Sequence, residues 1–247
     1  AFVEMGKAVR ESGVVGSSAT FDAMQHFELA SVPALAADRP WSIGVWLRPT
    51  GSLNGVLSKI EPTARRRGLE IVWQKGRLQL HLVERWGVDA IEVATRHPVK
   101  GGDWHHFVVT YDGSKKASGV RVHVDGEPVE LNVGRDSLTG SIDCDEPLRV
   151  GRRDTGPGYY GRQDELRVYA TSLATVEIRQ WYWSERLANL LKQTPEKRDA
   201  AAQTLLHDYF IAEHGDAEVR QLQATQRSAR AAEAELRAAL PRTMVMQ

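Results

Sequence analysis

The stretch over residues 104–126 constrains the fold more than any other part of the chain. Aromatic and β-branched residues dominate positions 104–111, a composition typical of a largely buried strand. Asp112 and Gly113 then predict a turn, because glycine accepts the positive φ that most other residues resist. Over residues 120–125 valines alternate with polar residues, which predicts a strand with one apolar face. The order strand, turn, strand predicts the middle of an antiparallel sheet.

The same alternation recurs on both sides of that stretch. Strands are expected over residues 21–29, 41–47, 69–73, 78–82, 148–150 and 164–169. Lys75 and Gly76 predict the turn of a hairpin between the third and fourth of these strands. The pattern predicts an all-β fold, an antiparallel β-sandwich over about residues 20–183, within a first domain of residues 1–184.

The composition changes after residue 172, and residues 173–182 suit a short helix that packs back on the sheets. The residues 194–196, Thr-Pro-Glu, predict the start of a longer helix. Gly215 predicts the end of that helix, and Asp216 can cap the next one. Two helices joined in this way predict an α-helical hairpin.

This hairpin is expected to form a second domain, the helical extension over residues 185–247. Its last helix carries a narrow apolar stripe at helical spacing, which includes Val219, Leu222 and Leu236. The stripe is too thin to bury much area. We therefore expect the extension to dock onto other domains of a larger protein.

The charge balance and the cysteine count exclude several classes of function. The chain has 32 Lys and Arg and 32 Asp and Glu, so its net charge favours neither a nucleic-acid partner nor an acidic membrane surface. No apolar run approaches the roughly 18–20 residues of a membrane span. Lys7, Arg10 and Glu11 interrupt any signal-peptide core. Cys144 is the single cysteine, which excludes an internal disulfide and cysteine-based zinc or haem sites.

Six motifs in a fixed order carry a family resemblance. They are FDA at 21–23, WSIGVWLRP at 41–49, WHHFVVTYDG at 104–113, VRVHVDG at 120–126, LRVG at 148–151 and GRQDELRVYATSL at 161–173. Together they resemble the laminin G-like jelly roll of the concanavalin A-like lectin/glucanase family. The resemblance spans roughly residues 20–182 and implies a β-sandwich with a recognition function.

The helical end adds a second resemblance. A laminin G-like domain followed by a helical hairpin and PRTMVM at 241–246 resembles multidomain proteins of planctomycetes that also carry cytochrome c-type domains. This resemblance implies a module inside a larger polypeptide that is exported, hence periplasmic or extracellular. No CxxCH motif is present, so any haem would belong to another part of such a protein.

The family resemblance also implies one structural Ca²⁺. Asp22 matches the acid of the early Phe-Asp motif and Asp164 matches the acid of the closing strand. Calcium takes about 6–8 oxygen ligands, and sheet edges offer carbonyls that one or two carboxylates can complete. In the alternative, Asp164 pairs with Arg162 or Arg167 or accepts backbone hydrogen bonds. The family's glycine after Phe-Asp is Ala23 here.

His105 and His106 form a pair that resembles a metal site only in sequence. Neighbouring residues on a strand point to opposite faces, so their rings cannot converge on one ion. We expect a histidine of this pair to be a partly buried, structural residue of the sheet.

Carbohydrate binding is the function that the fold resemblance suggests. Aromatic faces stack on the C–H surfaces of sugars, and Trp86, Tyr159 and Tyr160 lie beside turn residues. Arg66, within the run 65–67, and Arg152, next to Arg153, could bind sulfate or carboxylate groups. In the alternative, these loops are solvated and the aromatic residues cap the edge of the sandwich.

Two other classes of function remain as alternatives. A glucanase-type hydrolase is disfavoured, because the strand with acids at alternate positions that such enzymes use is missing: Asp143 and Asp145 alternate, but Pro147 follows. A structural module could use Trp181, Trp183 and the helices to dock neighbouring domains. We expect a non-catalytic domain that binds polysaccharide.

Overall fold

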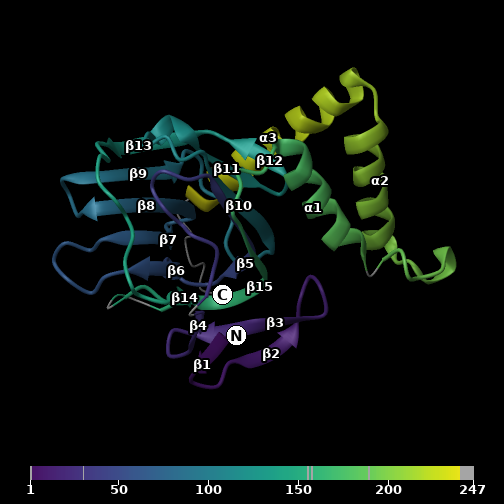
Figure 1. Ribbon diagram of the computed structural model, residues 1–247. Coiled ribbons are helices and arrows are strands. Elements are labelled where there is room, and N and C mark those ends of the chain that lie inside the picture. Colours follow the sequence, from purple (N-terminus) through teal and green to yellow (C-terminus); the bar gives the residue numbers. More distant parts are fainter. Residues whose placement is uncertain (1, 30, 155, 157, 189, 240–247) are drawn as a thin grey trace, which may run out of the picture. The chain divides into compact units, whose positions relative to one another are not determined.

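Two antiparallel sheets form the first unit of the chain (Figure 1). In the order of pairing, the eight-stranded sheet contains β1 (Phe2–Met5), β4 (His26–Leu29), β14 (Leu148–Val150), β6 (Leu53–Ile60), β7 (Gly68–Gln74), β8 (Arg77–Arg85), β9 (Asp89–Thr95) and β13 (Leu131–Asp136). The seven-stranded sheet contains β12 (Glu127–Val129), β11 (Val120–Val124), β10 (His105–Tyr111), β5 (Trp41–Pro49), β15 (Tyr160–Tyr169), β3 (Ser17–Asp22) and β2 (Val9–Ser12). One short 3₁₀ turn, η1 (Ala117–Gly119), precedes β11.

This computed structural model describes residues 2–239 except 30, 155, 157 and 189. The chain divides into two units, Ala1–Ala188 and Asn189–Gln247.

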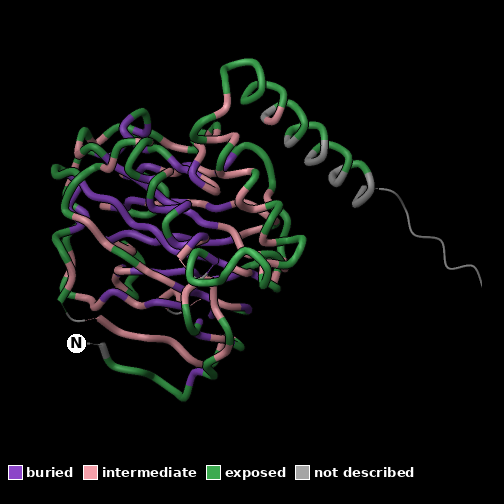
Figure 2. Tube along the Cα trace, turned by 90° about the vertical axis from the view of Figure 1, so that its right-hand side faces the viewer, coloured by how far each residue is buried: buried purple, intermediate pink, exposed green. Residues whose placement is uncertain are grey.

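The core lies between the inner faces of the two sheets, where the buried part of the tube in Figure 2 is concentrated. Alternate residues of β5 and β7 point into it, and Trp41, Ile71 and Trp73 are at most 2% exposed. The ring of Trp73 meets the ring of Phe107, from the opposite sheet, edge-on at 5.8 Å between centroids. Strand alternation therefore closes two sheets over one apolar interior, and the predicted antiparallel β-sandwich is confirmed.

The stretch 21–29 was predicted as one strand, and this prediction is wrong. β3 and β4 belong to different sheets, and a turn at residues 23–25 joins them. Ala23 has φ 72°, the conformation that the family's glycine would adopt without strain. The carboxylate of Asp22 accepts a hydrogen bond from the amide of Met24 at 3.1 Å, which stabilises this turn locally.

Helix α1 (Thr175–Ala188) packs on the outer face of the seven-stranded sheet. The indole N–H groups of Trp46, on β5, and Trp181, on α1, donate to the two carboxylate oxygens of Glu185 at 2.5 and 2.6 Å. Arg167 of β15 adds an ion pair to Glu185 at 2.6 Å. The ring of Trp181 lies directly over Gly44, where a Cβ atom would collide with it. The short helix that packs back on the sheets is therefore confirmed.

Trp181 and Trp183 are 7% and 5% exposed. α1 turns Trp181 toward the sheet, where its ring meets Gly44 and His106. Trp181 is therefore a packing residue of the sheet, and the docking of neighbouring domains by the helices stays a prediction.

His106, on β10, is enclosed beneath α1. Its ring stacks on Trp46 at 4.9 Å and meets Trp181 edge-on at 4.6 Å. Neither ring nitrogen has a hydrogen-bond partner among the described residues. Burial lowers the pKa of His106 to about 3, and burial also lowers the pKa of His123, which contacts Thr175 at 3.0 Å, to about 4.

We predict that acid weakens this helix–sheet contact. The folded-state pKa of His106 lies below its ordinary 6.5, so the unfolded chain binds more protons between pH 6.5 and about 3. The stabilisation is complete above pH 6.5 and is lost as the pH falls toward 3. Chemical denaturation at each pH measures the free energy of unfolding. Between pH 6.5 and 3.5 this free energy should fall by on the order of 3 kcal/mol more in wild type than in the variant His106→Phe. The exposed His97→Phe is the control, and equal pH profiles for all three proteins would refute the assignment.

The second unit contains the turn η2 (Pro195–Lys197) and the helices α2 (Ala200–His214) and α3 (Ala217–Ala239). The predicted helical hairpin is confirmed, with α2 ending before Gly215 and Asp216 accepting from the amide of Val219 at 2.8 Å. The predicted start at residue 194 is too early, because Asp199 caps α2 instead. None of the described helices is long and apolar enough to cross a membrane. The sequence at 241–246 lies outside the described residues.

Candidate functional site

A row of polar residues crosses the outer face of the eight-stranded sheet. The register of the strands places neighbours side by side in the order Glu28, Arg149, Ser58, Glu70, His81, Glu92 and Arg135. Their sequence neighbours Leu69, Leu80 and Leu82 point into the core, so the row faces away from it. Acids and bases alternate along most of this row, which allows each to pair with a neighbour.

Glu70 is the centre of the row and is fully buried. Its carboxylate accepts two hydrogen bonds from Arg153, from Nε at 2.8 Å and from Nη2 at 2.5 Å. Arg66 Nη2 lies 3.1 Å from Glu70 Oε2, and His81 Nδ1 lies 2.8 Å from Glu70 Oε1. Arg66 Nη1 donates to Asp154 Oδ2 at 2.8 Å. Residues 66, 70, 81, 153 and 154 are hereafter the Glu70 cluster.

The Glu70 cluster keeps its central acid ionised. Burial alone would raise the pKa of Glu70, but the hydrogen bonds from His81 and Arg153 and the charge of Arg153 hold that pKa at about 2. A general acid must carry a proton near neutral pH, so Glu70 is unsuited to that role.

Trp86 lies beside this cluster, in the turn between β8 and β9. The guanidinium of Arg66 lies 5.0 Å from the centre of its ring, and His81 meets the ring edge-on at 5.3 Å. The backbone N–H of Trp86 donates to the carbonyl of Arg65 at 2.8 Å. These contacts fix the ring, while 37% of the residue stays exposed. The structure therefore brings together Trp86 and Arg66, as two candidate ligand residues.

The arginines of the run 65–67 are paired within the chain. Arg65 forms an ion pair with Glu84, and Arg67 lies 3.8 Å from Glu61. Arg66 shares the two acids of the Glu70 cluster. Their charges are therefore compensated locally, which disfavours the bidentate binding of sulfate that the sequence suggested.

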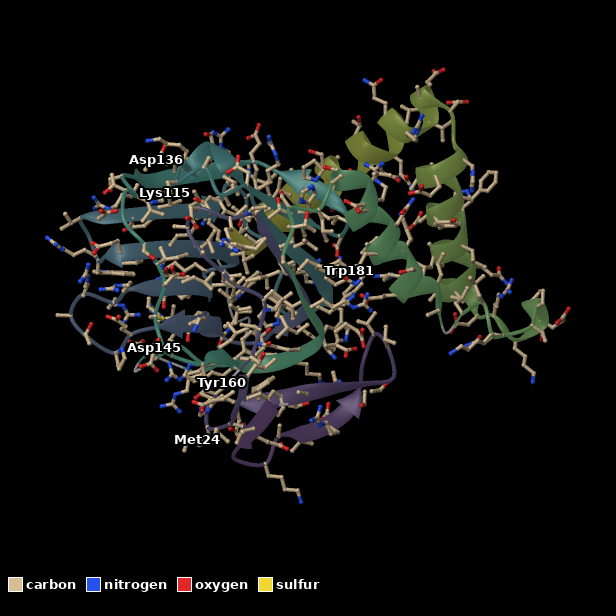
Figure 3. All side chains as sticks on the ribbon, in the orientation of Figure 1. Met24, Lys115, Asp136, Asp145, Tyr160 and Trp181 are labelled. Carbon is tan, nitrogen blue, oxygen red and sulfur yellow. The ribbon has the colours of Figure 1, made fainter. Side chains whose placement is uncertain are left out.

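The other candidates lie around the loop that follows β14. Arg152 forms a backbone bridge with Gly158, and its carbonyl accepts from Ser58 Oγ at 3.0 Å. Tyr160 begins β15 opposite Asp22 and is 48% exposed (Figure 3). Arg153 and Asp154, next to Arg152, belong to the Glu70 cluster, whereas Tyr160 belongs to the seven-stranded sheet.

Tyr159 does not belong to this surface. It is fully buried, its ring meets Phe21 edge-on at 5.9 Å, and its hydroxyl donates to the carbonyl of Arg162. The prediction that Tyr159 stacks on a ligand is therefore wrong. The turn residues before it suggested a loop, but β15 starts at Tyr160, four residues earlier than predicted.

The two acids proposed for calcium do not fit one ion. Asp22 faces Tyr160 across the sheet, and Asp164 lies four residues further along β15, roughly 13 Å away at the rise of a strand. The Asp164 carboxylate accepts from the backbone N–H groups of Val14 and Val15, at 2.8 and 3.0 Å, and from Glu165. It thus binds backbone amides, the alternative that the sequence left open. No group of three potential metal ligands occurs within residues 2–239 as described.

The sequence did not single out Glu70, His81 and Asp154. A signal for Glu70 was present, because a carboxylate between the core residues Leu69 and Ile71 of a strand needs a partner on the outer face. Its partners come from residues distant in the sequence, so the alternation alone does not identify them.

Solved structures with similar folds include binding domains of bacterial toxins. The binding domain of Paraclostridial Mosquitocidal Protein 1 aligns with a TM-score of 0.60 at 13% identity, over 74% of this chain and 47% of that domain. The binding domain of Botulinum Neurotoxin DC, in a structure with SialylT, aligns with a TM-score of 0.54 at 12% identity, over 75% and 46%. A botulinum neurotoxin type C structure aligns with a TM-score of 0.52 at 12% identity, over 75% and 46%. The chain thus spans about half the length of these domains, and the likeness extends to the fold.

A search of curated protein sequences found no match. A family model described as the concanavalin A-like lectin/glucanases superfamily matches residues 21–179, which is more than half of the chain. Together with the two-sheet sandwich, this match decides the family. The chain belongs to the concanavalin A-like lectin/glucanases superfamily.

Proposed function

We propose that this domain is a non-catalytic module that binds a neutral polysaccharide through the surface formed by Trp86, Arg66, Arg152 and Tyr160, the Trp86–Tyr160 surface. The observation that carries the proposal is that Trp86 is 37% exposed while Arg66 and His81 hold its ring in place. Because the ring is already ordered, stacking on a sugar would cost little conformational entropy.

The size and charge of this surface support an extended, neutral ligand. It includes two exposed aromatic residues, Trp86 and Tyr160, which are 37% and 48% exposed. In the Glu70 cluster the charges of two arginines are balanced by those of two acids. A neutral sugar chain that stacks on exposed aromatic rings matches these two properties.

Catalysis has less support. The buried Glu70 is ionised, with a pKa of about 2, and all its close neighbours are cationic or histidine side chains. Cell entry of botulinum neurotoxin type C depends upon interaction with two ganglioside molecules, but at 12% identity the likeness to that structure supports the fold alone. The proposal therefore depends on the exposed aromatic residues.

We expect the variants Trp86→Ala and Tyr160→Ala each to weaken polysaccharide binding at least about tenfold, since each removes a stacking face. Affinity electrophoresis against xylan, arabinan, laminarin and chondroitin sulfate, followed by calorimetry with oligosaccharides, would measure this. Phe210→Ala is the control, because Phe210 is an aromatic residue of the second unit that is 60% exposed. Binding that falls steeply with salt, or that survives both substitutions, would contradict the proposal.

A second role is supported by the helical unit. Phe210 of α2 is 60% exposed, and Leu222 and Leu236 of α3 are 63% and 70% exposed. We propose that these apolar side chains dock onto other domains of a larger, exported polypeptide. A protein truncated after Ala188 should then keep its melting temperature and its glycan binding. If the truncated sandwich folds but binds no glycan in the panel, docking becomes the favoured function.

A further inference from the structure

The sandwich is open at the edge where β2 and β3 face β4 and β14. Here the inner faces of the two sheets line a cavity of ≈ 480 Å³. Small-molecule sites occupy about 300–1,000 Å³, and an apolar cavity of about 150 Å³ already admits benzene. The volume is therefore sufficient for a substituted aromatic ring. Apolar side chains form most of the lining: Ala19, Phe21, Phe27, Leu29, Val150 and Leu166.

A β-bulge in β15 shapes this cavity. The register of β15 on β5 shifts between Asp164 and Arg167, and Glu165 has φ 49°, a strained value for a residue other than glycine. Regular alternation would turn residues 163, 165 and 167 to the same face. The extra residue instead turns Gln163 and Leu166 toward the interior, where both line the cavity. Such strain is concentrated at functional sites.

Gln163 supplies an unused acceptor in an otherwise apolar wall. The residue is 5% exposed, and its Nε2 donates to the carbonyl of Val56 at 3.1 Å. That bond orients the amide, and Gln163 Oε1 then has no partner within the described part of the chain. A buried carbonyl without a donor destabilises a fold by about 1–3 kcal/mol. A ligand hydroxyl in the cavity would satisfy it.

Arg10 supplies a positive charge at the same cavity. Its guanidinium lies 5.3 Å from the centre of the Phe27 ring, and no ion pair to it occurs among the described residues. The acids that line the cavity are engaged elsewhere: Asp164 binds backbone amides, and Glu165 pairs with Arg167 at 2.9 Å. The cavity therefore combines an apolar wall, one buried acceptor and one available cation.

We propose that this cavity binds a small hydroxylated aromatic carboxylate. Its ring packs against the side of the Phe21 and Phe27 pair, whose own rings meet edge-on at 5.5 Å. Its hydroxyl donates to Gln163 Oε1, and its carboxylate pairs with Arg10. The site is separate from the Trp86–Tyr160 surface, so neither proposal depends on the other.

Calorimetry of the full chain with 4-hydroxycinnamate, cinnamate and p-cresol tests each contact. Wild type should bind 4-hydroxycinnamate about tenfold more tightly than either analogue, because cinnamate lacks the hydroxyl and p-cresol lacks the carboxylate. Gln163→Met should remove the preference over cinnamate. Arg10→Gln should remove the preference over p-cresol. Arg121 is an exposed arginine that lines a different cavity, beside β11 and β12, so the control variant Arg121→Gln should change neither preference.

A cavity-filling variant gives an independent readout. Ala19→Leu places a larger side chain in the cavity and should abolish binding of all three compounds while polysaccharide binding persists. If Ala19→Leu fails to fold, the ligand preferences of Gln163→Met and Arg10→Gln decide the question. The proposal is overturned if wild type binds none of the three compounds, or if both variants keep the wild-type preferences.

Discussion

The variant Glu70→Ala is expected to lower the free energy of unfolding by about 3–5 kcal/mol, because it removes the buried counter-charge of Arg153 and leaves Arg66 with Asp154 alone. The same change should weaken polysaccharide binding, since Arg66 holds the ring of Trp86. Urea denaturation at pH 7, with calorimetry at a temperature where the variant is folded, measures both effects.

Glu92→Ala is the matched control for this prediction. Glu92 lies in the same polar row, two strands from Glu70, but its side chain is 28% exposed and pairs with Arg135 at 3.2 Å. Exposed pairs contribute about 0–1 kcal/mol, so this variant should stay close to wild type. Equal losses for Glu70→Ala and Glu92→Ala would show that Glu70 is not a buried centre of charge.

The contribution of the Glu70 carboxylate to stability should depend on pH. The pKa of Glu70 falls from 4.5 to about 2 on folding, so its contribution is present above pH 4.5 and is lost as the pH falls toward 2. The difference in stability between wild type and Glu70→Gln should therefore shrink by on the order of 3 kcal/mol across this window. A difference that stays constant down to pH 2 would contradict the ion network.

The variant Trp181→Ala is expected to lower the free energy of unfolding by about 3–5 kcal/mol, the range for replacing a large buried aromatic side chain with alanine. It removes the ring over Gly44 and one of the two indole donors to Glu185. Gly44→Ala should also destabilise the protein, because its Cβ would collide with that ring.

The double variant Gly44→Ala/Trp181→Ala tests whether the Cβ atom at position 44 destabilises the protein by colliding with the ring of Trp181. If the ring of Trp181 is the obstacle, Gly44→Ala should cost little once Trp181→Ala is present, which gives a strong coupling in a double-mutant cycle. Denaturation midpoints of the four proteins measure it. Additive losses would show that α1 does not rest on β5 through this contact.

The sequence predicted the sheets better than the surface. Alternation of apolar residues depends on a single strand, so β5, β7 and β10 could be identified from local patterns. The split of residues 21–29 into β3 and β4 could not, because it depends on Ala23 adopting a conformation that alanine rarely takes. Local sequence patterns do not predict a strand boundary where tertiary contacts determine the backbone conformation.

The candidate site shows the same limit at the level of side chains. Trp86 and Arg66 were recognised as loop residues, but their contact with each other depends on the pairing of β7 and β8. Tyr159 and Tyr160 are adjacent and look alike in sequence, yet one is in the core and the other is at the surface. Glu70 was missed because its partners Arg66, His81 and Arg153 meet only in the folded sheet.

The indole N–H resonance of Trp86 during titration with an oligosaccharide from the bound polysaccharide gives the most direct test of the proposed function. The signal can be assigned with the variant Trp86→Phe. The Trp86 signal should shift more than those of the buried Trp41, Trp46 and Trp73. If the oligosaccharide binds and the Trp86 signal stays in place, the Trp86–Tyr160 surface is not the binding site.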